Sequence, residues 1–188
     1  MDALMAALVA ALLAQASDRT HWCAALLSSR FARPVPVIAA LVIAVGVING
    51  LGAAAGAVIG PMMTPEAQSL MLALALIAAG GTALFRMTPP DALPDSRAGA
   101  FATSLLALLA LGFGDRTQFI TFAIAGRTPT PVLAFTGAIL GALAVTIPAA
   151  VMGENAWRAL PLRPIRLACC AVLLVAGLWI GLSGLGLR

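Results

Sequence analysis

Two stretches of the sequence decide the fold: LLAQASDRTHW at residues 12–22 and LALGFGDRTQF at residues 109–119. Each places the tripeptide Asp-Arg-Thr inside an otherwise apolar run, beginning at Asp18 in the first and at Asp115 in the second. The step from residue 18 to residue 115 is an offset of 97 residues.

The same offset, without any gap, aligns charged residues, prolines and small residues along the rest of the chain. The matching segments are Arg30 with Arg127, Pro34-Val35 with Pro131-Val132, and Ala79-Gly80 with Ala176-Gly177. Apolar matches mean little in such a biased sequence, whereas charges and prolines rarely coincide by chance. The sequence therefore predicts two copies of one unit.

The composition indicates that lipid is the solvent of this chain. Of its 188 residues, 62% are hydrophobic and only 10% are charged, whereas a soluble domain usually carries about 25% charged residues. A net charge of +4 would suggest a nucleic-acid partner in a soluble protein. Here most of the Arg residues lie between apolar segments, so we expect them to mark the cytoplasmic side of a membrane and expect no nucleic-acid partner.

Six membrane helices are predicted, because a spanning helix needs about 20 apolar residues. Four uncharged stretches are long enough alone, and two shorter ones become long enough when joined across their Asp-Arg pair. The predicted helices cover residues 3–28, 34–59, 66–86, 99–126, 129–152 and 165–186. They group into a first unit at 1–86 and a second at 99–188, joined by a cytoplasmic linker at 87–98.

An odd number of helices in each unit makes the second copy enter the membrane from the opposite side. The predicted fold is an all-α integral membrane protein with six transmembrane helices arranged as two inverted three-helix repeats. Secondary transporters commonly have this architecture and bind their substrates near the midplane. Arg residues are concentrated after the first, third and fifth predicted helices. Both termini are then expected outside a bacterial inner (plasma) membrane.

The tripeptides supply the only charges predicted inside the spans. Each charge costs about 2.5–3.5 kcal/mol at a helix centre, which is tolerated when charges pair or line a polar cavity. Asp18 and Asp115 are predicted at matching depths, with Arg19 and Arg116 as their charge partners. Asn49 and its mate in the second unit are expected either to line the same cavity or to hydrogen-bond across helices. Burial favours the uncharged form of a carboxyl group, so such a group can exchange a proton for a cation.

Helical spacing predicts the polar neighbours of the two carboxylates. Residues three or four apart share one face of a helix, which places Gln15 and His21 beside Asp18, and Gln118 beside Asp115. Oxygen-rich sites of this kind suit hard cations such as calcium, manganese or magnesium.

These segments resemble a motif of the cation/proton antiporters of Golgi, chloroplast and bacterial membranes, which export or redistribute manganese and calcium. Those proteins hold two inverted three-helix repeats, each with the motif Glu-x-Gly-Asp-(Lys/Arg)-(Thr/Ser). The matching segments here are Gln15-Ala16-Ser17-Asp18-Arg19-Thr20 and Gly112-Phe113-Gly114-Asp115-Arg116-Thr117. The resemblance implies a secondary transporter that exchanges a divalent cation, manganese or calcium, for protons. It implies a cation site at Asp18, Thr20, Asp115 and Thr117, in which the two Asp residues bind the metal.

The chain departs from the family motif at three positions. The family Glu is Gln15 in the first copy and Gly112 in the second, and the motif Gly is Ser17 in the first copy. Two carboxylates and two basic residues give the site a formal charge of zero, so a divalent cation gains less Coulomb attraction. Gln15 still offers a carbonyl oxygen, whereas Gly112 contributes no side chain.

Two alternative functions stay open at this point. One is a transport-deficient relative whose Asp-Arg pairs only hold the repeats together, since buried ion pairs are often structural. The other is an exporter of another small solute. An enzyme is not expected, because the sequence has one His and no Ser/His/Asp or Cys/His set. No permanently bound cofactor is expected, and the expected partners are the lipid bilayer, an inorganic cation and protons, with homo-oligomerisation left open.

Overall fold

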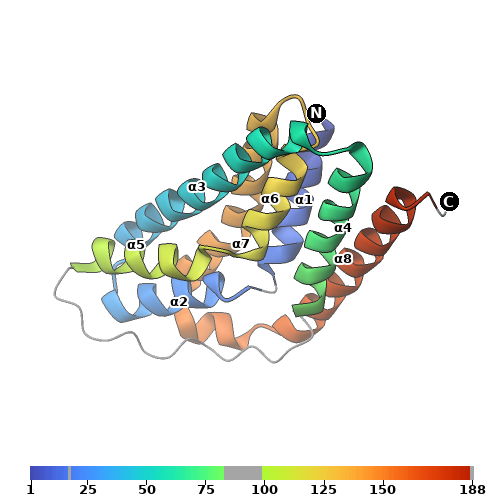
Figure 1. The fold of residues 1–188 in the computed structure, drawn as a ribbon. Coiled ribbons are helices and arrows are strands. Elements are labelled where there is room, and N and C mark those ends of the chain that lie inside the picture. The colour runs from blue at the N-terminus through green and yellow to red at the C-terminus, as the bar shows by residue number, and fades with distance from the viewer. Residues whose placement is uncertain (17, 83–98, 187–188) are drawn as a thin grey trace.

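The computed structural model describes residues 1–16, 18–82 and 99–186, and every regular element in these ranges is helical. Figure 1 shows the helices packed as one bundle, with α4 and α8 paired along one edge of it. The elements are α1 (Asp2–Gln15), α2 (Thr20–Phe31), α3 (Pro34–Ile59), the short 3-10 helix η1 (Gly60–Met62), α4 (Pro65–Thr82), α5 (Gly99–Gly112), α6 (Arg116–Ala125), α7 (Pro131–Ala159) and α8 (Leu162–Gly184). The predicted linker at 87–98 and the end of the predicted third helix lie outside the described residues.

The helix starts follow the duplication read from the sequence. Three pairs of helices begin 97 residues apart: α1 at Asp2 and α5 at Gly99, α3 at Pro34 and α7 at Pro131, and α4 at Pro65 and α8 at Leu162. Proline in the first turn favours a helix start, since its fixed φ suits the helix and its missing N–H is not needed there. The repeated Pro34 and Pro131 therefore account for the matching starts of α3 and α7.

Three helical segments are long and apolar enough to cross a membrane: Pro34–Met62, α7 and α8. The α5–α6 pair makes a fourth candidate span that is bent by 65°. The apolar helices α1 and α4 are shorter than a full crossing. The described residues thus give three or four crossing segments by length and composition, and the six-helix inverted arrangement stays a prediction.

The expected continuous helices at 3–28 and 99–126 are wrong in one respect, because each is interrupted at its tripeptide. Helix α1 ends at Gln15 and α2 begins at Thr20, while α5 ends at Gly112 and α6 begins at Arg116. Gly114, in the second break, has φ +79°, a left-handed conformation that glycine adopts without penalty and other residues avoid. Helical spacing across the tripeptides is therefore not a guide to which side chains meet.

The predicted end of the fifth helix at residue 152 marks a kink. Gly153 has φ 73° and ψ 177°, after which helical turns continue to Ala159. The backbone N–H of Glu154, freed by the kink, donates to the Ser29 hydroxyl over 2.7 Å. This contact joins α7 to the end of α2, so the kink is fixed by a partner from the other unit.

The two units interlock through close helix contacts at glycine. A Cβ at Gly56 of α3 would lie 2.3 Å from the Phe122 carbonyl oxygen of α6, and one at Gly141 of α7 would lie 2.3 Å from the Leu8 carbonyl oxygen of α1. Small residues at four-residue spacing allow such close approach of helices in membranes. Each contact joins a helix of one unit to a helix of the other, so the packing lies between the copies.

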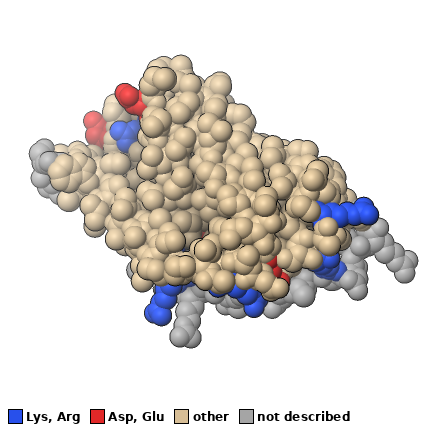
Figure 2. Space-filling model, turned by 180° about the vertical axis from the view of Figure 1, so that it is seen from behind, with Lys and Arg blue, Asp and Glu red and all other residues tan. Residues whose placement is uncertain are grey.

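The outer surface of the bundle is apolar over a broad area. On the face shown in Figure 2, charged side chains gather near opposite edges and an uncharged belt separates them. Helix α8 points large apolar side chains outward, with Val175 66% exposed and Trp179 56% exposed. Such a surface is unsuited to water and matches a lipid environment.

Candidate cation site

Each of the two Asp carboxylates accepts hydrogen bonds from groups at the start of the helix that follows its break. Asp115 is the N-cap of α6, and its carboxylate accepts hydrogen bonds from the backbone N–H groups of Arg116 (2.6 Å) and Thr117 (3.4 Å). Asp18 accepts from the Thr20 backbone N–H over 3.2 Å and from the Thr20 hydroxyl. The first N–H groups of a helix lack partners within the helix, and Asp is a favoured N-cap because its oxygens supply them. Asp115 thus caps α6, whereas Asp18 lies one residue before the N-cap Arg19 of α2 and holds the first helical residue, Thr20.

A small cavity lies where the two breaks meet. Its volume is about 10 Å³, which is room for about one water molecule. Its polar wall comes from both motif copies and from α3, through Gln15, Thr20, Asn49, Asp115 and Thr117. The rest of the wall is apolar, formed by residues including Leu41, Val45, Ile48 and Leu108. The cavity thus brings together oxygen atoms of residues that lie about a hundred positions apart in the chain.

Asp18 is absent from this wall but is connected to it through Thr20. Its side chain is buried and held by Thr20, which lines the cavity. Thr20, which holds Asp18, lines the same cavity as Asp115, so the two carboxylates are linked through one cavity. A single cation between them would relieve the repulsion of two like charges.

Two oxygen atoms of the cavity wall are buried without a hydrogen-bond partner among the described residues: Gln15 Oε1 and Thr117 Oγ1. Leaving a buried polar atom unpaired costs about 1–3 kcal/mol, and most buried polar groups have a partner. Carbonyl and hydroxyl oxygens are ligands of hard cations and of their bound water. The wall therefore presents the kind of oxygen atoms that a cation without its water shell would bind.

Asn49 connects the cavity to α6. Its Nδ2 donates to the Val45 carbonyl oxygen over 3.0 Å, and its Oδ1 accepts from the Thr121 hydroxyl over 2.8 Å. The Thr121 hydroxyl also contacts the Thr117 carbonyl oxygen at 2.7 Å. Thr121 was not predicted, although its position one helical turn after Thr117 places it on the same face of α6. This network holds α3 and α6 in register beside the cavity.

His21 and Gln118, both predicted at the site, support the breaks and are absent from the cavity wall. His21 Nδ1 lies 2.9 Å from the Gln15 carbonyl oxygen, and its ring packs beside Trp157 with ring centroids 5.5 Å apart. Gln118 Oε1 accepts from the Gly114 backbone N–H over 2.8 Å. The two residues are repeat mates, and each ties the first turn of its half-helix to the preceding break.

The two Arg residues differ in their surroundings. Arg19 is exposed although Asp18 beside it is buried, and Arg116 is partly buried. The break turns successive side chains in different directions, so the structure does not bring the Arg19 and Asp18 side chains together. The two tripeptides contain two acidic and two basic residues. This count alone therefore overstates how far the negative charges of the two carboxylates are neutralised.

A conventional metal centre is not seen in the described part of the chain. No group of three or more His, Cys, Asp or Glu side chains is arranged there to hold a metal ion. A cation in the cavity would depend on the Asp carboxylates together with amide and hydroxyl oxygens. Such a mixed oxygen set suits a cation that binds and leaves, as a transported substrate must.

Comparison with known proteins identifies the family. The sequence profile described as "Divalent cation/proton antiporter GDT1" matches residues 3–91 and again residues 100–187. The chain belongs to this family. The two matched segments begin at the offset that relates the tripeptides, so the GDT1 profile follows the internal duplication as well. GDT1 proteins are transporters rather than enzymes, and membership makes this chain a membrane transporter of cations.

A relative from Vibrio cholerae serotype O1 bears the name "Putative manganese exporter". It is 28% identical over 184 residues, which cover 95% of this chain and 90% of the relative. No solved structure matches the chain. The sequence resemblance to the cation/proton antiporters is thus confirmed along nearly the whole chain.

The geometry explains how this GDT1 member accommodates the loss of the second motif Glu. A Cβ at Gly112 would lie 2.4 Å from Ile48 Cδ1. Ile48 itself lines the cavity, so an apolar side chain of α3 occupies the space beside Gly112. Gln15, in the first copy, keeps its side chain on the cavity wall. The site is therefore asymmetric at the position of the motif Glu, where only the first copy has an oxygen-bearing side chain.

Proposed function

We propose that this chain exchanges a divalent cation, manganese by preference, for protons, and that the cavity between the two Asp-Arg-Thr segments is the exchange site. The observation that carries the proposal is the pair of unpartnered oxygens, Gln15 Oε1 and Thr117 Oγ1, beside the Asp115 carboxylate. Manganese is favoured over calcium because the Vibrio cholerae relative bears a manganese exporter's name. A compact cavity of about 10 Å³ also fits the smaller ion with fewer ligands better than calcium, which takes 6–8 oxygen ligands.

The two Asp residues are the proton carriers in this proposal. Each carboxylate binds either a proton or the cation, and the two groups are linked through one cavity. Entry of a cation favours the ionised carboxylates and so releases protons, while its departure favours protonation. Coupling of this kind needs no other titratable group inside the cavity.

The six-helix inverted arrangement belongs to the same proposal. Interrupted helices whose ends meet at a repeat interface are typical of secondary transporters, because irregular backbone is tolerated at membrane depth where it lines a cavity. In this chain α1–α2 and α5–α6 are the interrupted pairs. Inversion of the second unit would place both breaks at one depth, which the shared cavity supports.

Manganese flux in proteoliposomes that contain the full chain tests the function. Asp115→Asn and Asp18→Asn remove the carboxylate but keep a side chain of similar shape that still accepts hydrogen bonds. We expect an imposed pH gradient to drive Mn²⁺ uptake by the wild type and each variant to lose most of it, by about a hundredfold, as for loss of an essential proton-transfer group. Proton movement is read in parallel with a dye inside the vesicles.

Glu154→Gln is the matched control, because it neutralises a carboxylate that pairs with Arg158 over 2.7 Å, away from the cavity. It is expected to transport as the wild type does. Unchanged Mn²⁺ flux in both Asp variants would rule out the exchange site. Uptake that continues without any pH gradient and moves no protons would rule out antiport.

A transport-deficient relative is the second candidate, favoured by the loss of both motif Glu residues. In that case the Asp residues act only as helix caps, as their hydrogen bonds to Thr20, Arg116 and Thr117 allow. Folded wild-type protein that gives no Mn²⁺ flux, with Asp variants that lose thermal stability, would support this candidate over transport.

A further inference from the structure

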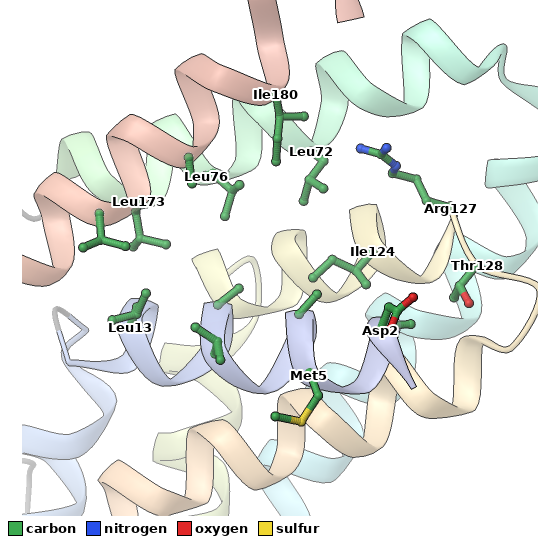
Figure 3. Close-up of a pocket in the computed structure, with 16 residues that line it drawn as sticks. Asp2, Met5, Leu13, Leu72, Leu76, Ile124, Arg127, Thr128, Leu173 and Ile180 are labelled. Atoms are coloured by element: carbon green, nitrogen blue, oxygen red, sulfur yellow. The ribbon is translucent and has the colours of Figure 1, made fainter. Parts of the chain in front are cut away.

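A long apolar groove runs along the outside of the bundle, separate from the cation cavity. Its volume is about 770 Å³, within the range of about 300–1,000 Å³ typical of small-molecule sites. It lies between α1, α4, α6 and α8, as Figure 3 shows. Leu72, Leu76, Leu173 and Ile180 line one side, and α1 lines the other.

Polar side chains are confined to one end of this groove. Of the sixteen residues that line it, the three with polar side chains are Asp2, Arg127 and Thr128. Arg127 and Asp2 stand at opposite sides of the mouth in Figure 3. An aqueous cation pathway needs polar groups along its length, whereas this groove is apolar from its mouth to Leu13. Its lining therefore suits a hydrocarbon chain with a polar head.

The length of the groove matches one leaflet of a bilayer. From Asp2 to Leu13 it follows α1 for eleven residues, or about 16 Å at 1.5 Å per residue. Half of the hydrocarbon core is about 15 Å thick. An acyl chain that begins at the charged mouth would therefore reach the deep end near the bilayer centre.

The charges at the mouth select the headgroup. A guanidinium group binds phosphate through paired N–H donors, and a carboxylate binds an ammonium group. The structure gives neither Arg127 nor Asp2 an ion-pair partner within the described residues, and both side chains are exposed. Their repeat mates are Arg30 and Gly99, so the opposite-charge pair exists in one copy only.

We propose that the groove binds one phosphatidylethanolamine molecule, with an acyl chain between α1 and α8, its phosphate on Arg127 and its ammonium on Asp2. A purely anionic headgroup would satisfy Arg127 but be repelled by Asp2. A phosphatidylcholine headgroup carries the same charges but has no N–H to donate to Asp2. This site goes beyond the cation exchange proposed above and depends only on the chain lying in a membrane.

Native mass spectrometry of the full chain in a neutral detergent tests the proposal. Phosphatidylethanolamine, phosphatidylglycerol and phosphatidylcholine with identical acyl chains are added separately. We expect one bound phosphatidylethanolamine per chain, retained about tenfold more strongly than the other two lipids, as one additional charge-assisted hydrogen bond allows. Equal retention of the three lipids would overturn the headgroup assignment.

Three variants separate the parts of the site. Arg127→Gln should weaken binding of all three lipids about tenfold through loss of the phosphate contact, and Asp2→Asn should remove the preference for phosphatidylethanolamine. Ala176→Leu places a larger side chain in the groove and should reduce retention of every lipid. Ala171→Leu, exposed on α8 outside the groove, and Arg30→Gln are the controls and should bind as the wild type does.

Two results would overturn the proposal. The first is unchanged lipid retention in Arg127→Gln, a surface change that leaves the packed core intact. The second is a dimer mass that disappears in Ala176→Leu, which would show a second copy of the chain in the groove. Because lipid retention is measured without cation flux, neither result bears on the exchange site.

Discussion

Gln15 is the residue at which this chain differs most usefully from its family. Gln15 lines the cavity at the position where the motif of the family has Glu, and its Oε1 atom is buried without a hydrogen-bond partner among the described residues. Gln15→Glu keeps the shape of the side chain and adds one negative charge at an existing ligand position. Cation affinity rises with the number of charged ligands, so we expect the KM for Mn²⁺ in the flux assay to fall by about tenfold.

Gln118→Glu is the control for this change. Gln118 Oε1 accepts a hydrogen bond from the Gly114 N–H, which a carboxylate can also accept, and it is not on the cavity wall. Its KM for Mn²⁺ should stay within about twofold of the wild type, since a charge outside the cavity is more strongly screened. An equal fall in both variants would show that overall charge, and not the Gln15 position, sets the affinity.

At the residue scale, the role of the predicted side chains in cation binding stays a prediction, while the structure shows which of them lie together and with what local geometry. Gln15, Thr20, Asp115 and Thr117 line the cavity as the motif comparison implied. His21 was assigned to the site through helical spacing, which fails because the helix stops at Gln15. The free energy of a capping hydrogen bond differs little from that of a continued helix. The sequence alone therefore does not show whether a carboxylate within an apolar run ends a helix.

At the element scale, one of the close helix contacts between the units leads to a stability prediction. A Cβ at Gly56 of α3 would lie 2.3 Å from the Phe122 carbonyl oxygen, whereas nothing lies within 4 Å of one at Gly46 of the same helix. Gly56→Ala should lower the free energy of unfolding by about 1–3 kcal/mol through overpacking. Gly46→Ala should be neutral or stabilising, because Ala favours the helix over Gly by about 1 kcal/mol.

Thermal unfolding of the purified chain in detergent, followed by loss of helical circular dichroism, compares the two substitutions within one helix. A midpoint for Gly56→Ala equal to or above that of Gly46→Ala would contradict the close α3–α6 contact. The sequence alone showed that both glycines lie in a long apolar segment. Which of the two glycines faces another helix depends on contacts with residues about 70 positions away in the chain. The pattern of residues within one segment carries no information about such contacts.

At the scale of the whole molecule, the duplication was predictable and the interlocking of its copies was not. The matched Pro34 and Pro131 stand at the first positions of α3 and α7, and α1 with α5 and α4 with α8 also begin 97 residues apart. The packing joins α1 to α7 and α3 to α6, so neither unit has a core of its own. The hydrophobic clusters contain residues of both copies, and we infer that one unit expressed alone would leave its glycine faces uncovered.

The last prediction concerns the number of membrane crossings, which depends on whether α4 crosses the bilayer. Met62 precedes α4 and Thr130 follows the α5–α6 pair, and both are exposed. If α4 and the α5–α6 pair both cross the bilayer, these two positions lie on the same side. If α4 does not cross, they lie on opposite sides. Six crossings with the termini outside further place Met62 and Thr130 outside, and Arg163 on the cytoplasmic side, as the distribution of Arg indicates.

Labelling of single-cysteine variants from one side of the membrane tests this topology. The native Cys23, Cys169 and Cys170 are buried, so the unmodified chain should give little reaction with a membrane-impermeant maleimide. We expect Met62→Cys and Thr130→Cys to be labelled in intact bacterial spheroplasts, and Arg163→Cys only after lysis. Labelling of Met62→Cys and Arg163→Cys but not of Thr130→Cys in intact spheroplasts would show that α4 and the α5–α6 pair do not both cross the bilayer. The inverted arrangement would then be wrong, since the two units would cross the membrane an unequal number of times.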